Sequence, residues 1–147
     1  MKKIMFLTLL LVVTAANAGP VLEKLKNTPA TQYQVGIFQL EWLTFILKHQ
    51  MKDEYAKGSS FKFSDVGIDK NEGSIYLRLS FIGNTKDVTN EQCSVIKEDY
   101  SRSFNLNELS NKIWPGLTED DYKALESEFS MKMELISRDN KNFSVSC

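Results

Sequence analysis

The sequence predicts an α+β fold, in which one long N-terminal helix packs on an antiparallel sheet of two hairpins, with short helices between them. A helical apolar pattern extends from Thr28-Pro29 to Lys57. Segments that alternate apolar and polar residues follow within residues 60–83 and 131–147, and each of these regions predicts two strands.

The first eighteen residues have the three parts of an export signal. They open on two lysines, continue through the apolar residues 4–13 (IMFLTLLLVV) and end on the small-x-small pattern Ala-Asn-Ala at 16–18. This apolar run is shorter than the roughly twenty residues that a membrane-spanning helix needs. We therefore expect a signal peptide at 1–18 cleaved after Ala18, a periplasmic location, no membrane anchor and a single globular domain at 19–147.

Charge and cysteine content narrow the functional classes. The chain has 18 Lys and Arg against 19 Asp and Glu, and removing Lys2 and Lys3 leaves 16 against 19, a net charge of −3. Nucleic-acid-binding domains usually carry a clustered basic face, so we expect no nucleic-acid partner. Cys93 and Cys147 predict one disulfide in an oxidising compartment, with an intermolecular bridge as the alternative.

The long helix carries two apolar stripes. The first has 4-3-4-3-4 spacing and consists of Tyr33, Ile37, Leu40, Thr44, Leu47 and Met51. The second consists of Phe38, Trp42, Phe45 and His49, extended by Val35 and Ile46. A surface helix in a monomer needs one such stripe, about 100° wide. The helix is therefore either wrapped by its own sheet or shared with a partner, and we assign Phe38, Trp42 and Phe45 to a homodimer interface.

Two strands, at 60–66 and 74–83, predict the first hairpin, joined by the polar connection 67–73. Strands at 131–135 and 143–147 predict the second hairpin.

Helix-start signals lie between the hairpins. Thr89 and Gln92 have the spacing of a capping box, and Thr118 can cap a short helix at about 119–128. The acidic residues that follow Thr118 are favoured by the dipole of a first helical turn, so they need no functional explanation. The sequence leaves residues 105–116 ambiguous.

The sequence shows no catalytic, metal-binding or cofactor-binding motif. The one histidine, His49, has no identifiable nucleophile or orienting carboxylate, so we interpret it as structural. Asp69, Asn71 and Gly73 hint at a calcium loop, but the twelfth position is Ser80 rather than glutamate. We expect no enzyme activity, metal or cofactor, although a carboxylate pair that forms only in space remains the alternative.

The order of these features resembles a known class of protein. The signal MKKIMFLTLLLVVTAANA, the helix TQYQVGIFQLEWLTFILKHQ, the hairpin strands and the terminal cysteine resemble the periplasmic immunity proteins that protect bacteria from type VI secretion effectors. The most similar type is the immunity partner of a peptidoglycan-degrading, lysozyme-like domain on a spike protein. The resemblance covers the whole chain and implies stoichiometric inhibition of a cognate cell-wall hydrolase, antibacterial protection and a homodimer.

Such an inhibitor needs polar or basic groups on a rigid support to enter a carboxylate-lined cleft. Two polar loops fit this description, with solvated hairpin turns as the plainer alternative for each. They consist of Asp69, Lys70, Asn71 and Glu72, and of Asp139, Asn140 and Lys141. In the first, Lys70 is the residue expected to meet a catalytic carboxylate.

A periplasmic small-ligand carrier, similar to cystatins or nuclear transport factors, is the second functional hypothesis. In that arrangement the long helix crosses a curved sheet, and six aromatic residues line a pocket between them. These residues are Phe38, Trp42, Phe45, Tyr55, Phe61 and Phe63.

Overall fold

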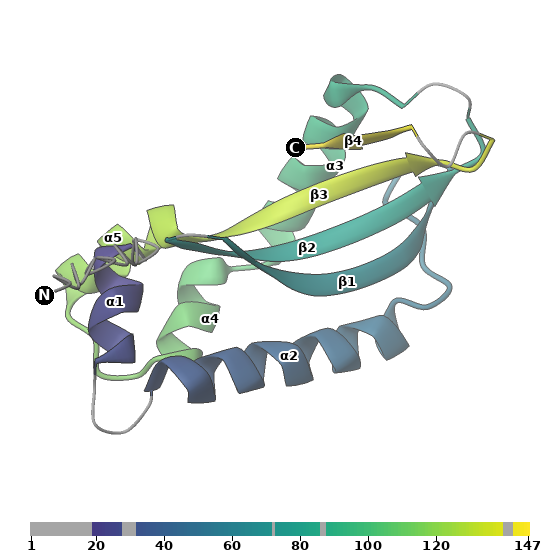
Figure 1. The fold of residues 1–147 in the computed structure, drawn as a ribbon. Coiled ribbons are helices and arrows are strands. Elements are labelled where there is room, and N and C mark those ends of the chain that lie inside the picture. The colour runs from purple at the N-terminus through teal and green to yellow at the C-terminus, as the bar shows by residue number, and fades with distance from the viewer. Residues whose placement is uncertain (1–18, 28–31, 72, 86–87, 140–142) are drawn as a thin grey trace, which may run out of the picture.

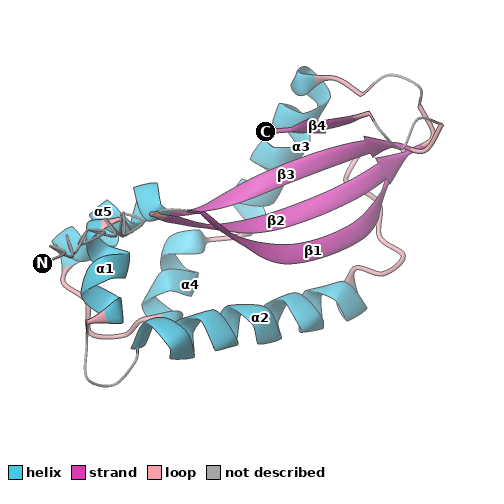
Figure 2. Ribbon diagram, viewed as in Figure 1, coloured by secondary structure: helices cyan, strands magenta, loops and turns pink. Residues whose placement is uncertain are grey.

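The computed structural model describes residues 19–27, 32–71, 73–85, 88–139 and 143–147 and confirms the α+β class (Figures 1 and 2). The helices are α1 (Pro20–Lys26), α2 (Gln32–Gln50), α3 (Asn90–Ser103), α4 (Leu106–Ile113) and α5 (Glu119–Glu128). The strands are β1 (Phe61–Asn71), β2 (Ser74–Gly83), β3 (Phe129–Ser137) and β4 (Ser144–Ser146). No helix in the described part of the chain is both long and apolar enough to cross a membrane.

The sheet is mixed, with strand order β1-β2-β3-β4, so the predicted all-antiparallel sheet is wrong. Both hairpins form, because β1 pairs antiparallel with β2 and β3 with β4. However, β2 and β3 run parallel, with Ile75 beside Phe129 and Gly83 beside Ser137. The three helices between them return the chain to the end of the sheet where β2 starts, and a long crossover of this kind is what parallel pairing requires.

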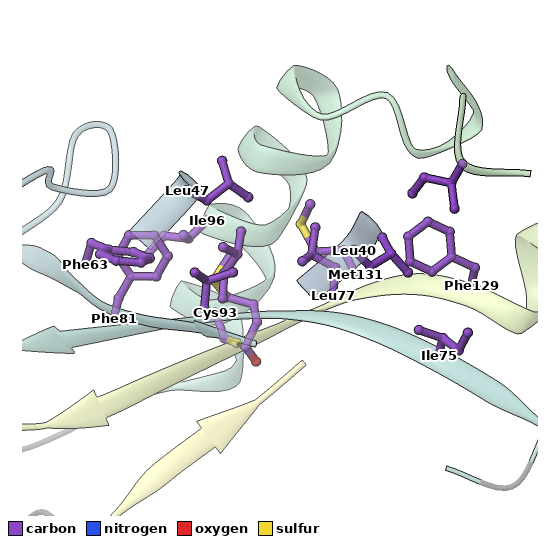
Figure 3. Packing of buried hydrophobic residues seen from close by; sticks show 14 of the residues in the cluster. Leu40, Leu47, Phe63, Ile75, Leu77, Phe81, Cys93, Ile96, Phe129 and Met131 are labelled. Carbon is purple, nitrogen blue, oxygen red and sulfur yellow. Dashed lines mark hydrogen bonds between the residues drawn. The ribbon is translucent and has the colours of Figure 1, made fainter. Parts of the chain in front are cut away.

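The core lies between the sheet and the helices α2, α3 and α4, which cover one of its faces (Figures 1 and 3). Side chains of β3 alternate between buried and half-buried along its whole length, so every second residue enters this core. The helices contribute Leu40 and Leu47 from α2 and Cys93 and Ile96 from α3. This packing fixes α2 against the sheet by one face only.

The N-terminal helical region differs from the prediction of one long helix. A separate helix, α1, precedes the predicted helix, whose expected start at Thr28-Pro29 lies outside the described residues. At its other end α2 stops at Gln50, seven residues before Lys57.

The chain leaves the helix after Gln50 because it pairs with the start of β1. The Ala56 amide donates to the Phe61 carbonyl (2.8 Å), and the Phe63 amide donates to the Glu54 carbonyl (2.9 Å). Gly58, the residue after the predicted end of the helix, has φ +68° in the turn between these segments.

Strand β1 continues to Asn71, so the predicted polar connection at 67–73 shortens to Glu72 and Gly73. Gly73 has φ +80°, which suits a tight hairpin. A register shift between Phe63 and Asp65 marks a bulge at Ser64. Since a bulge inserts one extra residue, it reverses the alternation and turns Asp65 towards the face away from the core.

The short helices agree with the start signals in the sequence. Thr89 and Gln92 form the predicted capping box of α3, and Thr118 forms another with Asp121 at α5. The ambiguous segment contains α4, which Asn105 caps by accepting a hydrogen bond from the Glu108 amide.

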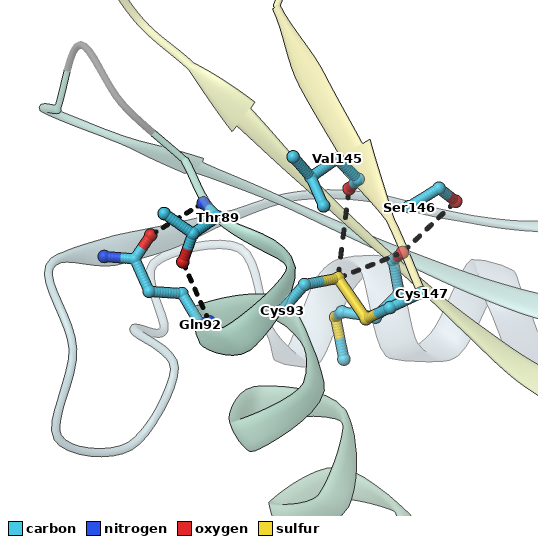
Figure 4. The surroundings of a disulfide bond; sticks show 7 residues. Thr89, Gln92, Cys93, Val145, Ser146 and Cys147 are labelled. Carbon is cyan, nitrogen blue, oxygen red and sulfur yellow. Dashed lines mark hydrogen bonds between the residues drawn. A yellow bond between two sulfur atoms is a disulfide. The ribbon is translucent and has the colours of Figure 1, made fainter.

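The Cys93–Cys147 disulfide is present within the chain (Figure 4). Its Cα atoms are 6.1 Å apart, and it joins the first turn of α3 to the residue that follows β4. The pairing agrees with the predicted intramolecular bridge.

Gly36 lets α2 approach the rest of the protein closely. A Cβ atom at this position would lie 2.5 Å from Cε2 and 2.9 Å from Cδ1 of Trp114, which is 1 % exposed. The indole therefore lies directly on the helix backbone. Its Nε1 atom has no hydrogen-bond partner in the described part of the protein.

We expect Gly36→Ala to lower the free energy of unfolding by about 2 kcal/mol. Alanine is a better helix former by about 1 kcal/mol, but overpacking a buried ring that cannot move costs more. Urea denaturation measures the difference. Gly58→Ala is the contrasting variant, since a Cβ there meets no atom within 4 Å and only the positive φ opposes it. A stabilised Gly36→Ala protein would contradict this packing.

Candidate binding surface

The second apolar stripe of α2 lies on the solvent side of the helix. Residues two apart on a helix point about 200° apart, so Phe38 and Trp42 face away from the buried Leu40 between them. Their exposed fractions are 68 % and 59 %, and that of Phe45 is 54 %. Half or more of each ring is therefore uncovered in a single chain.

The rings of this stripe contact one another. Trp42 and Phe45 are stacked with their centroids 5.5 Å apart, and Phe45 meets the His49 ring edge-on at 4.9 Å. His49 is exposed and has no hydrogen-bonded carboxylate or hydroxyl among the described residues. We call Val35, Phe38, Trp42, Phe45 and His49 the aromatic stripe.

A groove of about 330 Å³ opens beside the C-terminal half of the stripe, between α2 and β1. Its lining consists of Phe45, Lys48, His49, Lys52, Phe63 and Ser64. Two lysines and a histidine thus surround two phenyl rings. We call this the basic groove, and its lining suits an anionic group attached to an apolar body.

Ion pairs along the edge of the sheet hold α2 beside β1. Lys48 Nζ lies 2.6 Å from Asp65 Oδ1, and Lys70 Nζ lies 3.5 Å from Glu41 Oε1. No ion pair of Lys52 is found among the described residues. Lys52 is therefore the groove cation that is available to a partner.

The first predicted binding loop is not a projecting loop. Asp69, Lys70 and Asn71 belong to β1, and Glu72 lies outside the described residues. Asp69 accepts a hydrogen bond from Arg78 (3.2 Å), and Lys70 pairs with Glu41. The hairpin is therefore tighter than the sequence suggested, and the charges of Asp69 and Lys70 have partners within the chain, whereas the role of these residues in binding stays a prediction.

The second predicted loop is described only at its start. Asp139 is exposed just after β3, whereas Asn140 and Lys141 lie outside the described residues. Its role in binding stays a prediction.

Sequence reasoning missed a charge cluster on the outer face of the sheet. The Arg78 guanidinium donates to the buried hydroxyl of Ser80 (2.7 Å), which itself donates to Glu134 (2.9 Å). Asp65 and Asp69 also lie near Arg78, at 3.7 and 3.2 Å. These four charges come from three strands, and only the strand pairing and the Ser64 bulge bring them together.

The environment of Asp65 shows how these charges balance. Burial raises the pKa of this carboxyl, but the hydrogen bond and charge of Lys48 outweigh it, with help from the Val66 amide and Arg78. The pKa of Asp65 is therefore lowered overall. The Asp65 carboxylate therefore contacts both Lys48 of α2 and Arg78 on the outer face of the sheet.

The six aromatics of the carrier hypothesis do not line one common pocket, although Phe45 and Phe63 both border the basic groove. Phe61 and Phe63 are buried in the core, whereas the other four are largely exposed. The space between α2 and the sheet is filled by side chains such as Leu40, Leu47 and Phe81 (Figure 3).

No group of three or more His, Cys, Asp or Glu side chains is placed to hold a metal ion in the part of the chain that the structure describes. Comparison with known proteins adds no relative, since no protein-family model, curated protein or solved structure matches this chain.

Proposed function

We propose that this protein is an exported inhibitor that binds a cell-wall-degrading hydrolase and blocks its cleft, as an immunity protein of a type VI secretion effector does. The observation that carries the proposal is the basic groove, where Lys52 has no ion pair among the described residues. The export signal that the sequence predicts at residues 1–18 supports a target in the compartment of the cell wall.

The aromatic stripe supports the homodimer that accompanies the proposal. Aromatic residues are enriched in the cores of protein interfaces, and a large exposed apolar patch on a soluble protein marks an interaction site. The three large rings leave roughly 400 Å² of apolar surface open, given the area that an aromatic side chain presents. A second copy of the chain is the occupant that we propose for it.

The basic groove supports the choice of target. Most glycan hydrolases act with a pair of Asp or Glu residues in the cleft. Lys52 lies two residues after the end of α2, and α2 packs on the sheet through Leu40 and Leu47, so the backbone at Lys52 adjoins a rigid support. We therefore expect Lys52, rather than Lys70, to meet a catalytic carboxylate of the hydrolase, because Lys70 already pairs with Glu41.

A viability experiment tests the proposal. The effector encoded beside this gene, or a panel of periplasm-directed wall hydrolases, is expressed in a sensitive host with and without the protein. We expect rescue that requires residues 1–18 and a purified complex with one inhibitor chain per hydrolase. Absence of both rescue and binding across the panel would overturn the proposal. The carrier hypothesis would then be the next to test, by mass spectrometry of molecules that co-purify with the protein.

We expect Lys52→Glu to weaken inhibition of the cognate hydrolase about tenfold or more, because a like charge then faces the catalytic carboxylates. Titration of wall-degrading activity with purified protein measures the change. Lys123→Glu is the matched control, since it makes the same change of charge on the exposed face of α5. Equal loss in both variants would mean that net charge, not the groove, is responsible.

A further inference from the structure

Glu128, at the end of α5, is a buried carboxylate that holds the start of α1. It is 4 % exposed, and its two oxygens accept hydrogen bonds from the Val21 amide (3.0 Å) and the Leu22 amide (2.8 Å). Figure 1 shows α1 lying against α5. No Lys or Arg pairs with Glu128 among the described residues.

A buried carboxylate without a cation is costly, because its hydration is lost and hydrogen bonds only partly replace it. The basic side chains on the neighbouring elements are engaged elsewhere, including Lys26, which lies over the Tyr33 ring, and Lys123, which pairs with Glu119. On α1 and α5, Lys24 pairs with Asp121, and Glu23 accepts from the Asn27 amide. On the strands, Arg78 and Lys132 contact Asp69 and Tyr76.

Gly19 lies directly beside this carboxylate. A Cβ atom on Gly19 would be 2.5 Å from Cγ and 2.6 Å from Oε2 of Glu128, so a larger residue here would require the carboxylate to shift. Because N and Cβ of one residue are about 2.5 Å apart, the Gly19 nitrogen is within about 5 Å of Oε2. The same nitrogen donates to the Gly73 carbonyl (3.2 Å), which fixes its position at the β1–β2 hairpin.

We propose that removal of the signal peptide supplies the missing cation, so that the new α-ammonium group of Gly19 pairs with Glu128. Hydrolysis of the Ala18–Gly19 peptide bond by signal peptidase consumes one water and leaves a carboxylate on Ala18 and an amine on Gly19. That amine takes up a proton below its pKa. It keeps its hydrogen bond to Gly73 and gains a charge that the uncleaved amide does not have.

The consequence is that the processed domain is more stable than the same fold in its precursor. An α-amino group has an ordinary pKa of about 7.7 to 8.0, and a neighbouring carboxylate raises it in the folded state. The added stability is therefore fully present below about pH 7.7 and is lost as the pH rises through the raised value.

Thermal unfolding of two forms of the mature chain tests the proposal. One form begins with a free Gly19, and the other is acetylated on Gly19, which restores the neutral amide of the uncleaved chain. We expect the free form to melt about 5 °C higher at pH 6.5, and the gap to close as the pH approaches about 11. Equal melting temperatures at pH 6.5, or a gap that does not change with pH, would overturn the ion pair.

Substitution of the carboxylate identifies the partner. Glu128→Gln removes the charge and keeps one of the two hydrogen bonds, because only its carbonyl oxygen can accept, so the gap between the free and acetylated forms should disappear. Glu126→Gln, two residues away and exposed, should leave the gap unchanged. A gap that survives in Glu128→Gln would assign the effect to another group. If this variant fails to fold, the proposal is still tested by the unsubstituted chain, through the pH dependence of the difference in melting temperature between its free and acetylated forms.

Discussion

Loss of the Cys93–Cys147 disulfide is expected to lower the free energy of unfolding by about 4 kcal/mol. The bridge closes a loop with a sequence separation of 54, and the chain-entropy model gives about this value for a loop of that size. For a domain of this length, the melting temperature should fall by roughly 15 °C. The effect is large because the bridge fastens the last residue, and β4 contains only three residues.

Reduction of the unsubstituted protein is the cleanest measurement, because no side chain changes. Thermal unfolding with and without a thiol reductant should show the full decrease. Cys147→Ser supplies the control, since its melting temperature should already be low and should not respond to the reductant. Two titratable thiols in the native, unreduced protein would contradict the bridge itself.

Features that depend on neighbouring residues were predictable from the sequence. The capping box at Thr89 needs only two side chains three residues apart, and it forms as expected; Thr118 caps α5 as expected, and Asp121 completes a second box there. The face of α3 that carries Cys93 and Ile96 follows from helical periodicity in the same way.

Features that depend on distant residues were not predictable. The parallel pairing of β2 with β3 depends on the end of the sheet at which the helices between them place the start of β3. No local sequence pattern indicates that position. The end of α2 depends on competition from the Ala56–Phe61 and Phe63–Glu54 hydrogen bonds. In both cases tertiary structure overrides a reasonable local interpretation.

The binding surface was predictable in part. The second stripe of α2 was visible as an excess of apolar residues, because helical spacing alone places Phe38 and Trp42 opposite Leu40. The basic groove was not visible, since it needs Lys52 from the end of α2 beside Phe63 from β1. The bulge at Ser64, which sets the direction of the Asp65 side chain, has no recognisable pattern in the sequence.

Trp42→Glu is expected to convert a dimer into a monomer. The aromatic stripe is nearly symmetric about Trp42, with Phe38 four residues before it and Phe45 three residues after. Two antiparallel copies of α2 related by a two-fold axis therefore place Phe38 of one chain opposite Phe45 of the other, with Trp42 near the axis. Because central aromatic residues dominate such interfaces, a charge there should weaken association at least a hundredfold.

Sedimentation velocity at micromolar concentration measures the change. Val95→Glu is the matched control, since Val95 is equally exposed on α3 and lies outside the stripe. A wild-type monomer would exclude the homodimer directly. If that wild-type monomer bound the hydrolase and Trp42→Glu abolished the binding, the stripe would be part of the target surface. If instead Trp42→Glu gave monomers that still inhibited through Lys52, dimerisation and inhibition would be carried by separate surfaces of the same helical region.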